Sequence, residues 1–153
     1  MRSLMMKLIP AALCLCLALT ACGAPAQKEA FDPEKTAQAL LDSGAFEDTL
    51  DTIDQDAAVE LYGLDAATVT GCVVYTSLSA GAEEIAVLTL TDEDAAKTAL
   101  GQLEQRVADQ KAALESYQPE EVAKLDKAIL EQRGASVLLA VAADADAAKA
   151  ALD

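Results

Sequence analysis

Residues 69–90 read VTGCVVYTSLSAGAEEIAVLTL, and this stretch carries the clearest strand pattern of the chain. Its two ends, 69–78 and 84–90, are rich in valine, threonine and isoleucine, which favour strands. Small residues and a glycine separate them at 79–82, as expected for a turn. The stretch therefore predicts two strands joined as a hairpin.

A long helix is expected directly after the hairpin. Thr91 is expected to cap its amino end, where the acidic residues 92–94 would face the positive end of the helix dipole. Pro119 would end it after roughly 25 residues, and a further turn of helix is expected at 120–125. Apolar residues recur at steps of three and four: Ala96, Leu100, Leu103, Val107, Leu114 and Tyr117.

The strand–strand–helix pattern then repeats. Residues 127–132 and 135–142 predict two more strands around a tight turn at 133–134. Asp144 is expected to cap a final helix that runs to Leu152. Two such units predict an α+β domain, in which a four-stranded, mainly antiparallel sheet carries helices packed on one face.

The segment upstream of the hairpin is less regular. Asp and Pro at 32–33 have the pattern of an N-cap followed by proline in the first turn, and predict a helix that stops near 43–44. Residues 46–53 are compatible with a strand or an irregular segment. Residues 56–62 predict a short helix that ends at Gly63.

Residues 1–21 have the organisation of a lipoprotein signal peptide, and 19–22, Leu-Thr-Ala-Cys, resemble a bacterial lipobox. The apolar run at 8–19 is too short to cross a hydrocarbon core of ~30 Å comfortably. The resemblance implies cleavage between Ala21 and Cys22 and lipidation of the Cys22 sulfur. Acyl chains such as palmitate would then anchor the protein to the cell membrane on its extracytoplasmic face. An ordinary secretory signal with an incidental cysteine is the alternative.

The mature chain is expected to consist of the lipidated cysteine and a flexible tether, 22–31, followed by a single α+β domain, 32–153. Processing would leave Cys72 as the only other cysteine, and its β-rich, apolar surroundings predict a buried small hydrophobe. No internal disulfide is expected.

The charge of the chain excludes several classes of protein. Acidic residues number 26 against 11 basic ones, there is no histidine, and aromatic residues make up 3% of the chain. A nucleic-acid partner would require a basic face, so none is expected. Histidine-based catalysis and imidazole metal sites are excluded, and no cofactor or metal ligand is predicted.

Two acidic patterns are candidates for chemistry. Glu83 and Glu84 are adjacent on a predicted strand and would point to opposite faces, so they would not act on the same bond; one of them is expected to cap backbone amides in the hairpin. The second pattern lacks the glycine and spacing of an EF-hand loop, so a solvated face is favoured over a weak calcium site. Its members are Asp42, Glu47, Asp48, Asp51, Asp54, Asp56 and Glu60.

From residue 61 onward the chain resembles a family of bacterial lipoproteins known as domain of unknown function family 4358. The resemblance is carried by LYGLD at 61–65, GAEEIAV at 81–87, YQPEEVAKLDKA at 117–128 and QRG at 132–134, with FEDTL at 46–50 upstream. It implies a lipid-attached α+β domain and brings no activity, ligand or catalytic residue.

The sequence thus favours a membrane-anchored, non-catalytic domain that binds an envelope protein or another partner. A small-ligand or calcium-binding accessory receptor at the cell surface is the alternative. A carboxylate-based hydrolase is the third reading, because abundant acidic residues could supply a catalytic pair.

Overall fold

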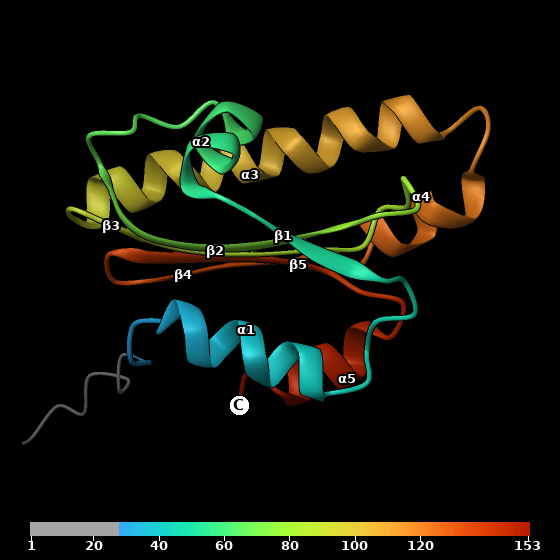
Figure 1. The fold of residues 1–153 in the computed structure, drawn as a ribbon, viewed down its shortest axis with the longest axis horizontal. Helices are drawn as coiled ribbons and strands as arrows, with labels where there is room; N and C mark the ends of the chain where they lie inside the picture. Colours follow the sequence, from blue (N-terminus) through green and yellow to red (C-terminus); the bar gives the residue numbers. More distant parts are fainter. Residues whose placement is uncertain (1–27) are drawn as a thin grey trace, which may run out of the picture.

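One antiparallel sheet organises the computed structural model, which describes residues 28–153 (Figure 1). Its strands are β1 Leu50–Ile53, β2 Val69–Ser77, β3 Glu84–Leu90, β4 Ile129–Arg133 and β5 Ser136–Val141. They lie in the order β1-β2-β3-β5-β4, so the two predicted hairpins meet through β3 and β5. The α+β class and the antiparallel pairing are confirmed.

The prediction of four strands is wrong, because β1 adds a fifth at the edge of the sheet. Its four residues, Leu50–Ile53, pair antiparallel with Val74–Ser77 of β2. Asp51 and Thr52, in the middle of this strand, are exposed. Four residues are too few for a sequence pattern to distinguish a strand from an irregular segment. In the folded chain, pairing with β2 makes this segment a strand.

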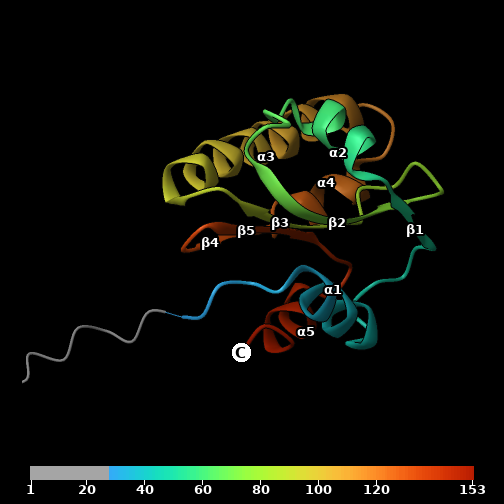
Figure 2. The ribbon, with the colours of Figure 1, turned by 60° about the vertical axis from the view of Figure 1, so that its left-hand side comes forward.

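Within residues 28–153, five helices cover the sheet: α1 Pro33–Asp42, α2 Gln55–Tyr62, α3 Glu93–Leu114, α4 Pro119–Leu125 and α5 Ala145–Ala150. The prediction that they pack on one face is wrong. Figure 1 and Figure 2 show α1 and α5 on one side of the sheet and α2, α3 and α4 on the other. The molecule therefore has three layers, with the sheet in the middle.

The central strands explain the two helical layers, because both of their faces are buried. Ile85 and Val87 of β3 belong to the core under α1 and α5. Ala86 and Leu88 of the same strand belong to the core under α2, α3 and α4. A strand that is apolar at every position is typical of a sheet covered on both faces.

The caps at the helix starts are mostly those expected. Asp32 and Asp144 cap α1 and α5. The predicted cap of α3 is wrong by one residue: Asp92, not Thr91, accepts a hydrogen bond from the Ala95 N–H, at 2.8 Å.

Because α3 ends at Leu114, Tyr117 lies beyond it and is 64% exposed, not buried on the helix face.

The described chain begins on the α1 side of the sheet, at the end remote from the β2–β3 hairpin (Figure 1, Figure 2). The predicted cleavage site at Ala21 and lipidation at Cys22 lie outside the described residues. Within residues 28–153, no helix combines the length and the apolar character that a membrane crossing requires.

Candidate functional site

An open pocket of about 510 Å³ lies beside the β2–β3 hairpin, between α2 and the second half of α3. We call it the hairpin pocket. Its apolar lining includes Ile53, Leu61 and Tyr117. Its polar lining consists of Thr76, Ser77, Glu83, Glu84, Arg106 and Gln110.

Glu84, the first residue of β3, is a buried carboxylate with two charged or polar partners. It is 1% exposed. Its Oε1 accepts a hydrogen bond from the Tyr62 hydroxyl of α2 at 2.7 Å, and its Oε2 accepts one from Arg106 Nη2 of α3 at 3.0 Å. Burial and the neighbouring carboxylate raise the pKa of Tyr62 well above its usual value, so its hydroxyl keeps the proton that it donates.

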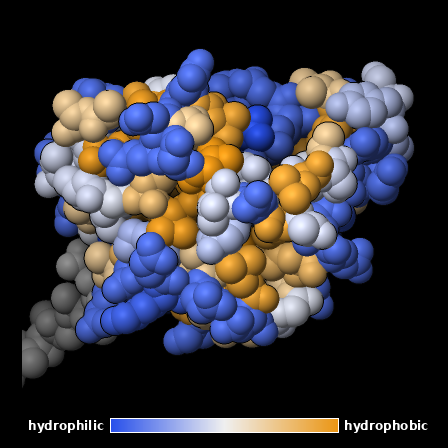
Figure 3. Space-filling view, in the orientation of Figure 1, coloured by the Kyte–Doolittle hydropathy of each residue, from blue (hydrophilic) through white to orange (hydrophobic). Residues whose placement is uncertain are grey.

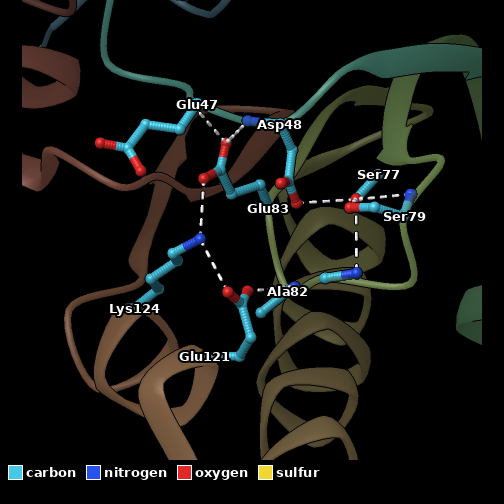
Figure 4. A network of polar contacts seen from close by, with 9 residues as sticks. Glu47, Asp48, Ser77, Ser79, Ala82, Glu83, Glu121 and Lys124 are labelled. Atoms are coloured by element: carbon cyan, nitrogen blue, oxygen red, sulfur yellow. Dashed lines mark hydrogen bonds and ion pairs between the residues drawn. The ribbon is translucent and has the colours of Figure 1, made fainter. Parts of the chain in front are cut away.

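Glu83 is equally buried but binds a different set of groups (Figure 4). Its Oε2 accepts hydrogen bonds from the backbone N–H groups of Glu47 at 2.9 Å and Asp48 at 3.1 Å. Its Oε1 accepts one from Lys124 Nζ of α4, also at 2.9 Å. The carboxylate therefore ties together the hairpin, α4 and the segment that leads into β1.

Lys124 is held between two carboxylates. Its Nζ lies 2.9 Å from Glu83 Oε1 and 2.9 Å from Glu121 Oε1. Burial alone lowers the pKa of Lys124, but the hydrogen bonds and charges of Glu121 and Glu83 outweigh it and raise the pKa above the usual value. The ammonium group stays charged and compensates the buried glutamate.

The hairpin turn is fixed by a second set of polar contacts, which Figure 4 also shows. The Ser77 hydroxyl donates to Asp48 Oδ2 at 2.7 Å and accepts from the Gly81 N–H at 3.3 Å. Glu121 Oε2 accepts from the Ala82 N–H at 2.7 Å. A Cβ atom at Gly81 would collide with Asp48 Oδ2, so a larger residue would have to displace the Asp48 side chain.

Two polar atoms beside the pocket are buried without a hydrogen-bond partner among residues 28–153: Arg106 Nε and Gln110 Oε1. The two residues are one turn apart on α3, so they lie on the same side of that helix. An unpaired buried donor or acceptor is costly, and native structures contain few of them. Both atoms are enclosed by the protein itself, so neither is open to solvent.

Two of the exposed large apolar side chains in the described part of the chain line this pocket. Large hydrophobic side chains are exposed at Leu61 (38%), Leu78 (65%) and Tyr117 (64%). Leu61 and Tyr117 line the pocket, and Leu78 follows its lining residue Ser77 in the chain. Figure 3 shows apolar side chains exposed among hydrophilic ones on the face of the molecule seen in Figure 1. Exposed apolar groups gathered at one opening are typical of an interaction site.

The two glutamates confirm one part of the prediction and correct another. They bind separate groups, as expected for side chains that do not act together. Glu83 does bind backbone amides, but these belong to the segment before β1 and not to the hairpin. The hairpin amide of Ala82 is bound by Glu121, because α4 folds back against the turn.

Several of the remaining acidic residues have local structural roles or are exposed. Asp54 caps α2, Asp42 accepts a hydrogen bond from Gln38, and Asp56 and Glu60 are exposed. In the described part of the chain, no three acidic, cysteine or histidine side chains form a group that could hold a metal ion.

Cys72 of β2 is half-buried and packs against the core under α3, so the prediction of a buried small hydrophobe is confirmed only in part. Burial raises the pKa of its thiol. A thiol of this kind is a poor nucleophile near neutral pH.

Sequence reasoning missed Arg106, Gln110 and Lys124. A signal was present for the first of these, because Arg106 lies between Leu103 and Val107 at the edge of the apolar face of α3. A cation in that position needs an acidic partner from another element. Nothing in the sequence says that the partner is Glu84.

Fold and site together define a three-layer α+β domain with a buried ionic cluster beneath an open, apolar-rimmed pocket. The chain belongs to the family described as Domain of unknown function (DUF4358), whose model matches residues 42–142. The matched range includes every residue that lines the hairpin pocket. No curated protein and no solved structure matches the chain.

Proposed function

We propose that this protein is a lipid-anchored binding domain on the extracytoplasmic face of a bacterial membrane, and that it engages a partner through the hairpin pocket without catalysis. One observation carries the binding role: the charged side chains at this pocket neutralise one another, while large apolar side chains at its mouth stay exposed. Glu84 is bound by Tyr62 and Arg106, and Glu83 by Lys124.

The compensation of these charges supports binding over catalysis. A general acid or base needs a group that can exchange its proton with a substrate. Glu83 and Glu84 are both 1% exposed and bound to donors of the protein itself. In contrast, a partner that covers exposed leucine and tyrosine side chains removes apolar surface from water, which stabilises the complex.

The pocket volume supports a second candidate, a small-ligand accessory receptor. A cavity of about 510 Å³ is within the usual size range of small-molecule sites. The two candidates use the same surface and differ in the size of what it binds.

The anchor is proposed from the lipobox-like residues 19–22, and cells fed radiolabelled palmitate would test it. The label should enter the wild-type chain, persist in Cys72→Ala and disappear in Cys22→Ala. Globomycin, which blocks lipoprotein signal cleavage, should make the larger, uncleaved precursor accumulate in place of the mature chain. Label retained by Cys22→Ala would contradict the anchor.

The binding role can be tested separately, by placing a photoreactive amino acid at Leu61 in intact cells. Leu61 lines the pocket, whereas Ala39 is exposed on α1, in the opposite layer, and provides the matched control. We expect a discrete crosslinked product from position 61 and none of that size from position 39. Identical products from both positions, or none from position 61, would refute the proposal.

A further inference from the structure

We infer that the outer edge of β4 binds an extended, acidic segment of a partner polypeptide, which joins the sheet as a further strand. This surface is separate from the hairpin pocket, and the inference does not depend on the function proposed for that pocket. β4 and β1 lie at opposite margins of the sheet, so each has a neighbouring strand on one side only (Figure 2).

The register of β4 shows which of its backbone groups are open. Arg133 pairs with Ser136 across the two-residue turn, and the C=O of the turn residue Ala135 accepts a hydrogen bond from β3 at 2.8 Å. Because successive residues of a strand turn their N–H and C=O groups to alternate sides, Ser136 bonds to Arg133 of β4. The same alternation along β4 makes the backbone groups of Gln132 and Leu130 point away from β5.

This open edge has defined ends. The Ala128 N–H bonds to the Leu125 C=O at the end of α4, and the Gln132 side chain donates to the Gly134 C=O. Between these ends, the outward N–H and C=O groups of Leu130 and Gln132 have no hydrogen-bond partner among residues 28–153. An extended chain is the structure that pairs with donors and acceptors spaced in this way.

The other margin of the sheet is closed by one of its own side chains. The Thr49 C=O bonds to the Leu78 N–H of the hairpin, so the Thr52 N–H, three places further on, faces outward. The Asp51 carboxylate accepts a hydrogen bond from this N–H at 2.8 Å. Charged side chains at an edge oppose the addition of a strand. In the described part of the chain, no side chain binds the outward N–H groups of β4 in this way.

Open space borders β4 along its length. One cavity, of about 930 Å³, is lined by residues 127–131 and by the start of α5. A second, of about 310 Å³, is lined by residues 131–134. All five residues of β4 are half-buried. A strand added at this edge would therefore have room beside every residue of β4.

The charges of the larger cavity favour an acidic segment. Lys127 and Lys149 line it, and neither forms an ion pair with an acidic side chain of residues 28–153. Of the carboxylates in its lining, Glu131 is paired with an arginine at 2.9 Å and Asp144 accepts from amides of α5, which leaves Asp146 against the two lysines. More distant charges of the chain are screened by salt beyond about 10 Å.

A second copy of this chain fits the edge less well. The antiparallel register that uses all the open groups of both copies pairs Leu130 with Gln132. That register places the two Glu131 side chains directly opposite each other, and like charges in this position are destabilising. The edge is therefore assigned to a different chain.

Hydrogen exchange measured by NMR tests the proposed hydrogen bonds directly. The mature protein, purified from the cells that make it, would be titrated with acetyl-Thr-Val-Glu-Val-Thr-amide, whose β-branched residues favour an extended chain. In the free protein the N–H groups of Leu130 and Gln132 should exchange fast, and that of Glu131, which faces β5, slowly. Saturating peptide should slow the first two by about tenfold or more and leave Glu131 unchanged.

A proline substitution tests the location. Gln132→Pro removes an outward N–H without removing a bond to β5, and should abolish peptide binding. Gln132→Val loses the same side chain but keeps the N–H, and should bind the peptide as the wild type does. Thermal melting of both variants shows whether they are folded. If Gln132→Pro does not fold, exchange of the two amides in the wild type decides.

A second pair of probes tests the charge. The peptide with lysine in place of glutamate should bind about fivefold more weakly, and Lys127→Ala combined with Lys149→Ala should remove this preference. Absence of binding at millimolar peptide, unchanged exchange of Leu130 and Gln132, undiminished binding by folded Gln132→Pro, or equal binding of the two peptides would overturn the inference. Protection of both amides without peptide, rising with protein concentration, would also overturn it, in favour of a second copy.

Discussion

Glu83 and Lys124 are 41 positions apart in the sequence, yet Lys124 Nζ donates a hydrogen bond to Glu83 Oε1 at 2.9 Å. The Glu83 side chain is fully buried and that of Lys124 is 18% exposed. The pair therefore fastens α4 to the start of β3, directly behind the hairpin pocket. A buried carboxylate in this position stabilises the fold only while its partners are present.

Substitution Glu83→Gln should lower the free energy of unfolding by about 3 kcal/mol. This is the lower end of the range for breaking a buried ion pair, because Glu121 still neutralises Lys124. Urea denaturation would measure the change. The control is Glu120→Gln, on the exposed side of α4, which should shift the value by less than about 0.5 kcal/mol. A loss in Glu83→Gln no larger than in this control would show that the pair does not stabilise the domain.

Substitution Tyr62→Phe should lower the free energy of unfolding by about 1–3 kcal/mol, because the buried Glu84 loses the hydroxyl that donates to it at 2.7 Å. Tyr117→Phe, at a residue 64% exposed, should change it by less than about 0.5 kcal/mol. Thermal and urea denaturation at neutral pH would test both, and equal effects would contradict the importance of the Glu84 contact.

The same residue makes stability depend on alkaline pH. The pKa of Tyr62 is raised in the folded protein, mainly by burial and then by Glu84. The unfolded chain therefore releases this proton first, and the stability it contributes is complete below pH ~10 and declines above it. Lys124, whose pKa is also raised, acts in the same direction.

Stability measured from pH 8 to 11 should therefore fall less steeply in Tyr62→Phe than in the wild type. In the wild type, absorbance of the tyrosinate anion should show one tyrosine that ionises later than the others, and the variant should lack it. A wild-type titration with all tyrosines ionising together would argue against the buried position of Tyr62.

Substitution Gly81→Ala should destabilise the domain by about 1–3 kcal/mol, because the new methyl group would overlap Asp48 Oδ2 and lie 3.2 Å from Glu121 Oε2. Gly101→Ala is the matched control. Gly101 is exposed within α3 and a Cβ there meets nothing within 4 Å, so alanine should stabilise the helix by up to about 1 kcal/mol. Opposite signs in thermal melting are the expected result, and a stabilised Gly81→Ala would contradict the geometry of the turn.

Acid should weaken the opposite edge of the sheet. The hydrogen bond with Arg133 is the largest cause that lowers the pKa of Glu131, against the effect of burial. The stability that Glu131 contributes is therefore present above its unfolded pKa of about 4.3 and is lost as the pH falls through the lower, folded value. Glu131→Gln should flatten the acid side of the stability profile between pH 5 and 3, and an unchanged profile would refute the contribution. The exposed Glu115→Gln provides the control.

Local pattern predicted the elements of this fold better than their arrangement. The hairpin at 69–90 and the second strand pair follow from β-branched content and turn residues. The number of layers was misjudged, although the uninterrupted apolar run of β5 contains the signal for a strand buried on both faces. β1 could not be predicted firmly, because its stability comes from pairing with β2 and not from its own four residues.

The site was harder to predict than the fold, for a physical reason. Glu83 and Glu84 stand out as a pair, and their separate partners agree with the expectation that they do not act together. Their partners come from α2, α3, α4 and the segment before β1, at separations of 22 to 41 positions. Contacts over such distances depend on how the helices dock on the sheet, which no local pattern determines.

The amino end of the described chain and the β2–β3 hairpin lie at opposite ends of the molecule (Figure 1, Figure 2). If a short amino-terminal tether held the domain to a bilayer, the hairpin pocket would therefore open away from the membrane. Arriving molecules could then enter without displacing lipid headgroups. Contacts with neighbours embedded in the bilayer would involve α1 and α5, which lie outside the range that the family model matches except for Asp42 at the end of α1.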